Sequence, residues 1–237
     1  MIMALLSIDN LCAGYGPIRV LHDLSLHVDE GEVVTLIGAN GAGKSTALRA
    51  VSRLIPIISG AIVYKNENIS TIPSHEIARR GIAHVPEGRG IFGNLSVLEN
   101  LKLSFYANRS GPAASKLLAG VFDMFPVLGE RKRQLASTLS GGEQQMLAIG
   151  RALIADGDLF IFDEPSMGLS PVFVKNVFSI IADIHKKGKT ILLVEQNATM
   201  ALNFSNRAYV LENGRIIAQG PSASIAGNTE LKRAYLG

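Results

Sequence analysis

Apolar and polar residues alternate along the first part of the chain, from about residue 4 to residue 30. A repeat of two places every second side chain on the same face, which is typical of antiparallel strands that bury one face. Residues 14–17 and 29–31 are rich in turn-forming residues, so we expect the strands to end there. The alternating apolar positions are Leu6, Ile8, Leu24, Leu26 and Val28.

Further along the chain, short runs that are mostly apolar replace the alternation. Residues 32–37, 159–162 and 190–194 are such runs. Their length and β-branched content are typical of strands buried on both faces of a parallel sheet. The other expected strands are residues 61–64, entered through a turn at 58–60, residues 81–85, and a hairpin of 209–212 and 215–218 with a type I′ turn at Asn213 and Gly214.

Between residues 87 and 154 the pattern favours helices. Ser96 and Glu99 have the spacing of a capping box, which predicts a helix to about residue 107. Ser140 and Glu143 repeat that spacing and predict a helix to about residue 155. The remaining helical signals are a break at residues 110–112, an apolar helical face formed by Leu118, Val121, Phe122 and Phe125, and a helix over 171–187 that Gly188 ends.

Composition excludes several classes of protein. The 237 residues are 47% apolar and 18% charged, with a net charge of +3 that no stretch concentrates, so charge gives no argument for nucleic-acid binding. The apolar runs are far shorter than the roughly 18–20 residues that span a bilayer. Residues 1–6 lack a basic region, so we expect a first strand there and not a signal peptide. Cys12 is the single cysteine, and we expect it to be a small buried hydrophobe in a cytosolic protein.

Residues 38–45 fit the phosphate-binding pattern G-x-x-x-x-G-K-[ST] between a predicted strand and a predicted helix. Glycines let backbone N–H groups surround a phosphate, and the helix N-terminus adds further donors. We expect Lys44 to reach the β- and γ-phosphates of ATP and the Ser45 hydroxyl to ligate Mg²⁺. The residues expected to bind nucleotide here are Gly38, Ala39, Asn40, Gly41, Ala42, Gly43, Lys44, Ser45 and Thr46.

The other buried strands also end in polar residues. Ligands gather at the carboxyl ends of strands in parallel sheets. We therefore expect Asp163, after the strand 159–162, to hold Mg²⁺ opposite Ser45. Glu164 would orient and deprotonate the attacking water. A surface turn would also accommodate an Asp-Glu pair, but it does not explain the wholly apolar strand in front of it. Residues 195–197 end the third such strand.

Residues 139–145 read LSGGEQQ, and on this motif the chain resembles the ATP-binding cassette (ABC) ATPases, whose signature is LSGGQ followed by Q or R. The resemblance covers the whole chain. It implies that the signature of one copy and the phosphate loop of another clamp one ATP in a head-to-tail dimer. Tyr15 falls where the family places its adenine-stacking aromatic residue, although an ordinary half-buried turn tyrosine is the alternative. The signature residues implied to contact nucleotide are Ser140, Gly141, Gly142 and Glu143.

The same resemblance implies an α/β fold with a P-loop NTPase (RecA-like) core, an N-terminal antiparallel β-subdomain and a helical subdomain. We expect a single domain over residues 1–237. Its core and β-subdomain would comprise residues 1–86 and 155–237, and residues 87–154 would form the helical subdomain with the signature motif.

The segments VPEGR, EPSxGLxP and LVEQN look like the ATP-binding subunit of branched-chain (hydrophobic) amino acid importers, and the smaller of the two such subunits in particular. Amide and urea importers have similar subunits. Four positions depart from the wider ABC pattern: Glu87 replaces a Gln, Glu143 replaces the signature Gln, Ser170 replaces an Asp, and Gln196 replaces the switch histidine. Two interpretations of Glu87 stay open: it lies near the phosphates with Mg²⁺ or Arg89 as its companion, or it faces a membrane partner.

The resemblance also implies partners and a location. The chain would pair as a homodimer, or as a heterodimer with a second ABC ATPase subunit, on integral membrane permease subunits that work with a solute-binding protein. It would be cytoplasmic and peripheral on the inner face of the cell membrane, docked through residues 87–133, with no nucleic-acid partner. The catalytic set would be Lys44, Glu164 and Gln196, the cofactors ATP and Mg²⁺, and the metal ligands Ser45, Asp163 and Glu87.

Two other function classes remain as alternatives at this stage. A small-molecule kinase of the P-loop group would use the same phosphate loop, but it gives no reason for the motif at Ser140. A non-transport ABC protein acting on DNA or ribosomes usually carries two cassettes or a coiled-coil insertion, and this sequence shows one cassette and no heptad run.

Overall fold

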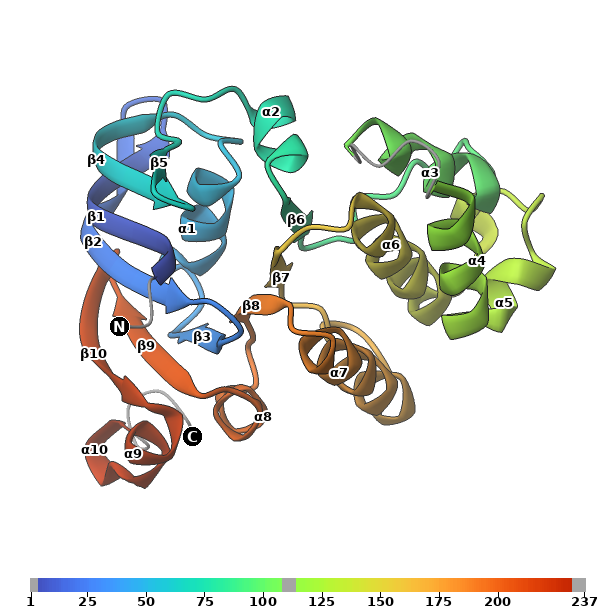
Figure 1. Ribbon diagram of the computed structural model, residues 1–237. Helices are drawn as coiled ribbons and strands as arrows, with labels where there is room; N and C mark the ends of the chain where they lie inside the picture. The colour runs from blue at the N-terminus through green and yellow to red at the C-terminus, as the bar shows by residue number, and fades with distance from the viewer. Residues whose placement is uncertain (1–3, 108–113, 232–237) are drawn as a thin grey trace.

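The computed structural model describes residues 4–107 and 114–231, and two sheets organise them (Figure 1). The first sheet has the order β2-β1-β4-β5, and its neighbouring strands are antiparallel. The expected antiparallel N-terminal strands are therefore confirmed from residue 4 onward. The strands are β1 (Ala4–Tyr15), β2 (Ile18–Asp29), β4 (Ile57–Tyr64) and β5 (Glu67–Asn68).

The second sheet has six strands in the order β10-β9-β3-β8-β7-β6. Its pairs are parallel from β9 to β6, and β10 pairs antiparallel with β9 in the expected hairpin. Asn213 and Gly214 both have positive φ, as a type I′ turn requires. The strands are β3 (Val33–Ile37), β6 (Ile82–Val85), β7 (Leu159–Asp163), β8 (Thr190–Val194), β9 (Arg207–Glu212) and β10 (Arg215–Pro221).

The six-stranded sheet is buried on both faces at β3, β7 and β8, whose residues are buried at every position. Val34 and Leu36 of β3 belong to one core, which also contains β1, β2 and helix α1 (Lys44–Val51). Val33 and Ile37 of the same strand belong to a second core, formed with the helices on the opposite face. Helix α1 accordingly lies between the two sheets (Figure 1).

The helices of the second core include a group that follows β6 in the chain. In Figure 1 this group lies across β6 and β7 from the antiparallel sheet. Helix α7 (Pro171–Lys186) packs under the same face of the sheet. The other helices of the group are α3 (Val97–Leu103), which continues into a 3₁₀ turn at Ser104–Tyr106, then α4 (Ala114–Met124), α5 (Pro126–Glu130) and α6 (Gly141–Ala155).

The structure corrects the expected pattern in two respects. The prediction of a turn at 58–60 is wrong. These residues continue β4, whose pairing with β1 shifts its register here, and Gly60 adopts φ +88°. The sequence pattern did not predict four short helices, because a helix of three to seven residues contains too few turns to show a helical repeat. They are α2 (Ser74–Arg79), α8 (Ala198–Phe204), α9 (Ser222–Gly227) and α10 (Thr229–Leu231).

Two further expectations concern single features. The break predicted at 110–112 falls outside the described residues. Cys12 is buried, as expected of a small hydrophobe. In the portion of the chain that the structure describes, none of the helices combines the length and the apolar character needed to cross a bilayer.

Candidate functional site

The phosphate-loop residues connect the end of β3 to the start of α1. Two glycines explain why this connection folds as it does. Gly43 stands directly before α1 in a left-handed conformation with φ +107°, which residues with a Cβ rarely adopt. Gly38 approaches β9 so closely that a Cβ would lie 2.2 Å from the carbonyl oxygen of Leu211. The loop is therefore shaped by contacts that larger residues would prevent.

Lys44 is folded over this loop and is almost fully buried. Its ammonium Nζ donates hydrogen bonds to the carbonyl oxygens of Gly38, at 2.9 Å, and Ala39, at 3.1 Å. The same Nζ lies 3.9 Å from Oε1 of Glu164. The charge of Lys44 thus faces both the loop and the carboxylate that follows β7.

Asp163, the last residue of β7, faces the start of α1. Its Oδ1 accepts a hydrogen bond from the Ser45 hydroxyl at 2.9 Å, whereas its Oδ2 is buried and has no hydrogen-bond partner in the described residues. Burial raises the pKa of Asp163, the Ser45 bond lowers it, and the charge of Glu87 raises it again. A buried carboxylate oxygen without a donor fits a divalent cation or a water bound to one.

A pocket of about 430 Å³ is lined by Lys44, Ser45 and Glu164, whereas the buried Asp163 is not among its lining residues. It combines segments that follow β3, β6, β7 and β8, at the carboxyl edge of the parallel sheet. Of the predicted site residues, those that line it are Asn40, Gly41, Gly43, Lys44, Ser45, Thr46, Glu87, Glu164 and Gln196.

Two residues near this pocket have partners that the sequence did not predict. The guanidinium of Arg89 donates to Oε1 of Gln144 on α6 at 2.6 Å, and the companion of Glu87 remains a prediction. Tyr15 is 39% exposed and outside the pocket lining, and its hydroxyl accepts a hydrogen bond from Arg49 at 3.2 Å. Contact of Tyr15 with a base remains a prediction.

The signature residues form the start of α6. Ser140 Oγ accepts a hydrogen bond from the Glu143 N–H, and the Glu143 carboxylate accepts one from the Ser140 N–H at 2.8 Å, so the expected capping box is present. The guanidinium of Arg131 lies 3.2 Å from the same carboxylate and forms an ion pair with it. Gly142 packs against α7, where a Cβ would lie 2.4 Å from the Phe173 ring.

This helix start is separated from the phosphate loop of its own chain. No residue of 140–143 lines the pocket of about 430 Å³, and α6 lies across β6 and β7 from α1 (Figure 1). One chain therefore presents two helix starts with the chemistry of anion sites, at different places on its surface.

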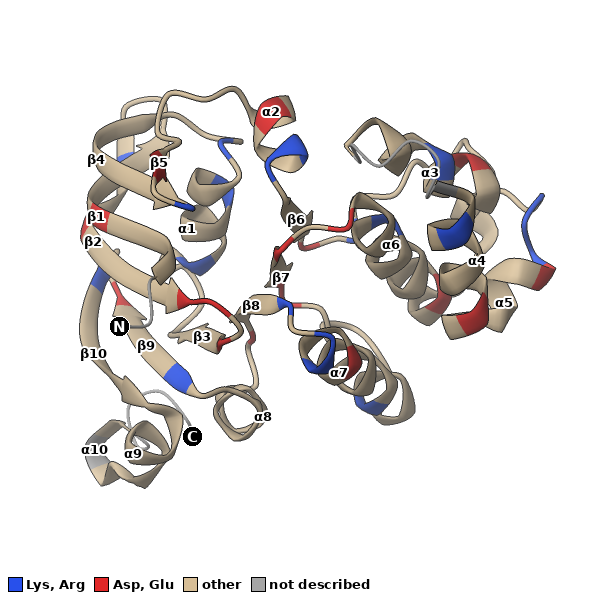
Figure 2. Ribbon diagram, in the orientation of Figure 1, with Lys and Arg blue, Asp and Glu red and all other residues tan. Residues whose placement is uncertain are grey.

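Acidic segments gather near the ends of β6, β7 and β8, in the middle of the view in Figure 2. Burial raises the pKa of Glu164, Lys44 lowers it, and the charges of Glu87, Asp163 and Glu195 raise it. Glu195 was not singled out from the sequence beyond its place in the polar cluster 195–197. It is 2% exposed and accepts hydrogen bonds from Ser166.

Comparisons with known proteins agree with this arrangement. The pattern of the family described as "ABC transporter" matches residues 21–167, more than half of the chain. The high-affinity branched-chain amino acid transport ATP-binding protein BraG of Pseudomonas aeruginosa is 47% identical over 98% of this chain and all of that protein.

Two more distant relatives are each 35% identical. One is the probable branched-chain amino acid transport ATP-binding protein LivF of Archaeoglobus fulgidus, aligned over 96% of both chains. The other is the lipopolysaccharide export system ATP-binding protein LptB of Haemophilus influenzae, aligned over 99% of this chain and 98% of that protein.

The fold matches a solved structure of the ATP binding subunit of an ABC transporter. The TM-score is 0.84 at 30% identity, and the match covers 98% of this chain and 96% of that chain. The expected α/β fold with a P-loop NTPase core is confirmed, and a small-molecule kinase is excluded. The chain therefore belongs to the ABC transporter family, as one of its ATP-binding ATPase chains.

Proposed function

We propose that this chain powers the uptake of branched-chain amino acids, or of a chemically related amide or urea cargo, through separate membrane permease subunits. The observation that carries the proposal is the pocket in which the phosphate loop, Glu164 and Gln196 face one another. The 47% identity to BraG favours this cargo over the lipopolysaccharide of the 35% identical LptB. The chain would work at the inner face of the cell membrane, together with a solute-binding protein.

In this proposal the phosphate loop binds the phosphates of ATP through its backbone N–H groups and Lys44. Glu164 is the general base: it takes a proton from water as the water oxygen bonds to the γ-phosphorus and the bond to ADP breaks. Gln196, which lines the same pocket, donates its amide N–H to the γ-phosphate. Tyr15 stacks on the adenine.

The donor set of the pocket fits Mg²⁺, because this ion prefers oxygen ligands and shares them with substrate phosphates. Ser45 and Asp163 would hold it, with Glu87 beside them, and the free Oδ2 of Asp163 supports this assignment. Magnesium would supply neutralisation of the charge that develops on the phosphates.

The second half of the ATP site would come from the signature helix of another copy, or of a similar ATPase subunit, through Ser140, Gly141, Gly142 and Glu143. The separation of the phosphate loop from α6 within one chain supports this arrangement. We also propose that residues 87–154 act as the helical subdomain, which contacts the permease through residues 87–133, and that residues 1–86 and 155–237 act as the core with the antiparallel β-subdomain.

The proposed transport role predicts a membrane complex. The chain, purified from native membranes in mild detergent, is expected to carry permease subunits with it, and the reconstituted complex to couple ATP hydrolysis to uptake of leucine, isoleucine or valine. Mass spectrometry and labelled-substrate uptake in vesicles measure the two results. Uptake of urea alone would correct the cargo, and binding of the chain to DNA or ribosomes in place of permease subunits would refute the transport role.

Gln196 gives a prediction about pH dependence. A histidine here would titrate near pH 6.5, at about its ordinary pKa, whereas an amide has no pKa in the accessible range. The rate of ATP hydrolysis should therefore show no pH step that belongs to this residue, and Gln196→Ala should lower the rate without changing the shape of the profile. A step near about pH 6.5 that vanishes in Gln196→Ala would contradict the prediction.

A further inference from the structure

The turn that carries Glu164 has an unusual backbone. Glu164 adopts φ +47°, in the left-handed region that residues other than glycine rarely occupy. Such a conformation is strained and persists only where the surroundings impose it. The contacts that impose it are therefore part of what places the carboxylate of Glu164.

Three hydrogen bonds join this turn to the end of β8. The N–H of Glu164 donates to the carbonyl oxygen of Val194 at 2.9 Å. The N–H of Ser166 donates to Oε1 of Glu195 at 3.0 Å, and the Ser166 hydroxyl donates to Oε2 of Glu195 at 2.8 Å. Val194 and Glu195, at the end of β8, thus hold Glu164 and Ser166, the first and third residues of the turn.

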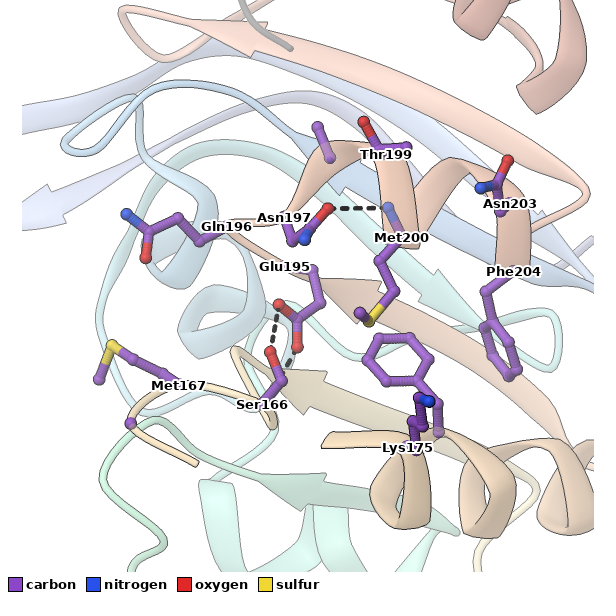
Figure 3. Close-up of a pocket in the computed structure, with 13 residues that line it drawn as sticks. Ser166, Met167, Lys175, Glu195, Gln196, Asn197, Thr199, Met200, Asn203 and Phe204 are labelled. Atoms are coloured by element: carbon purple, nitrogen blue, oxygen red, sulfur yellow. Dashed lines mark hydrogen bonds between the residues drawn. The ribbon is translucent and has the colours of Figure 1, made fainter. Parts of the chain in front are cut away.

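Figure 3 shows how these side chains lie around a pocket of about 1050 Å³ between α7, α8 and the loops after β7 and β8. The carboxylate of Glu195 points toward Ser166, and the next side chain, Gln196, points away from both. Gln196 lines this pocket as well as the nucleotide pocket, so the strand end that holds Ser166 also carries the predicted phosphate donor.

A buried carboxylate is stable only where donors satisfy it. Glu195 is 2% exposed, and its hydrogen bonds from Ser166 and from the backbone of Gln196 and Asn197 counter the rise in its pKa that burial causes. Hydrogen bonds to a charged group are among the stronger ones in proteins. The two bonds from Ser166 to the Glu195 carboxylate can therefore hold the strained turn in place.

We propose that Glu195 is a positioning residue for ATP hydrolysis: through Ser166 it holds the turn of Glu164 in register with the strand end that carries Gln196. The proposal rests on the proposed role of Glu164 as the general base. Glu195 itself does not contact ATP in this arrangement. It positions Glu164 and Gln196, which act on the attacking water and on the γ-phosphate.

The chain offers a sharp test of this role. Glu195→Ala removes both acceptors, whereas in Glu195→Gln the side-chain oxygen accepts from the Ser166 N–H and the amide donates to the Ser166 hydroxyl, which can also accept. A small misplacement of a catalytic group costs up to about 100-fold in rate. We expect Glu195→Ala to lower kcat by about 10- to 100-fold with the KM for ATP within about twofold of the wild type. Glu195→Gln should stay within about threefold of the wild-type kcat.

Coupled variants separate positioning from a general loss of structure. Ser166→Ala should cost little further activity in the Glu195→Ala background, since the two residues act as one unit. Asn203→Ala is the matched control, because Asn203 lines the same pocket at the far end from Ser166 in Figure 3, and it should leave kcat unchanged. A wild-type kcat in Glu195→Ala would overturn the proposal. So would a defect shared equally by Glu195→Gln, or one expressed as a raised KM with a lowered melting temperature.

A second measurement does not depend on turnover. In the full-length protein, the Ser166 amide should exchange its hydrogen slowly in the wild type and in Glu195→Gln, and much faster in Glu195→Ala. Equal exchange in all three would overturn the positioning role even if no hydrolysis could be measured. Conversely, full activity in Glu164→Gln would refute the proposed general base while the exchange result still decided whether Glu195 holds the turn.

Discussion

Glu164→Gln is expected to reduce ATP hydrolysis by about 100- to 10,000-fold, the usual scale for removal of a general base, while ATP binding persists. The amide has the shape of the carboxylate but cannot take a proton from water. Burial raises the pKa of Glu164 and brings it closer to the range in which a carboxylate is an effective base. Single-turnover phosphate release and equilibrium ATP binding measure the two halves of this prediction.

The matched control for this variant is Glu130→Gln, since Glu130 is an exposed acid at the end of α5, outside the nucleotide pocket. It should leave hydrolysis unchanged. Because the closed dimer is expected to form on ATP binding and reopen on hydrolysis, Glu164→Gln should also accumulate as an ATP-bound dimer in size-exclusion chromatography. Near-normal phosphate release in Glu164→Gln would refute the assigned role.

The sequence predicted the parts of the fold in which local pattern and tertiary packing agree. The runs that became β3, β7 and β8 are buried at every position and largely apolar because both faces of the sheet are covered there, and this composition could be recognised in the sequence. The capping boxes at Ser96 and Ser140 are local interactions over four residues, so the helix starts could be identified before any fold was known.

The parts that the sequence did not predict depend on contacts distant along the chain. Gly60 looked like a turn residue, yet β4 continues through it because its pairing with β1 imposes a shift of register. The ion pair of Arg131 with Glu143 was not predicted, because it forms only where α5 ends beside the start of α6. Neither contact can be predicted from the spacing of residues along the sequence.

In the site, too, the sequence predicted what a local motif specifies and did not predict what depends on distant contacts. The motif around Lys44 and the acidic end of β7 marked most of the residues that line the nucleotide pocket, because a phosphate loop has a fixed spacing in sequence. The role of Glu195 was not visible, since it depends on Ser166, 29 positions away and on a different strand end. A polar residue at the end of a wholly buried strand was the one available signal, and it did not indicate which neighbour the carboxylate would hold.

Lys44→Ala is expected to weaken ATP binding itself, by about 10- to 100-fold, because a charge-assisted hydrogen bond to phosphate contributes about 1.5–3 kcal/mol. In the structure its ammonium contacts two loop carbonyls and lies 3.9 Å from Glu164. A phosphate that replaced these partners would gain a cation that is already desolvated and held beside the loop. Equilibrium binding of a nonhydrolysable ATP analogue measures the loss.

Two companion variants decide whether the charge of Lys44 or its volume matters. Lys44→Met keeps most of the buried chain but not the ammonium, and it should bind nucleotide as weakly as Lys44→Ala. Lys186→Ala removes an ammonium from a side chain that is 74% exposed and paired with Asp183, and it should bind ATP as the wild type does. Wild-type affinity in Lys44→Ala would mean that the backbone N–H groups of the loop, with the dipole of α1, hold the phosphates without this cation.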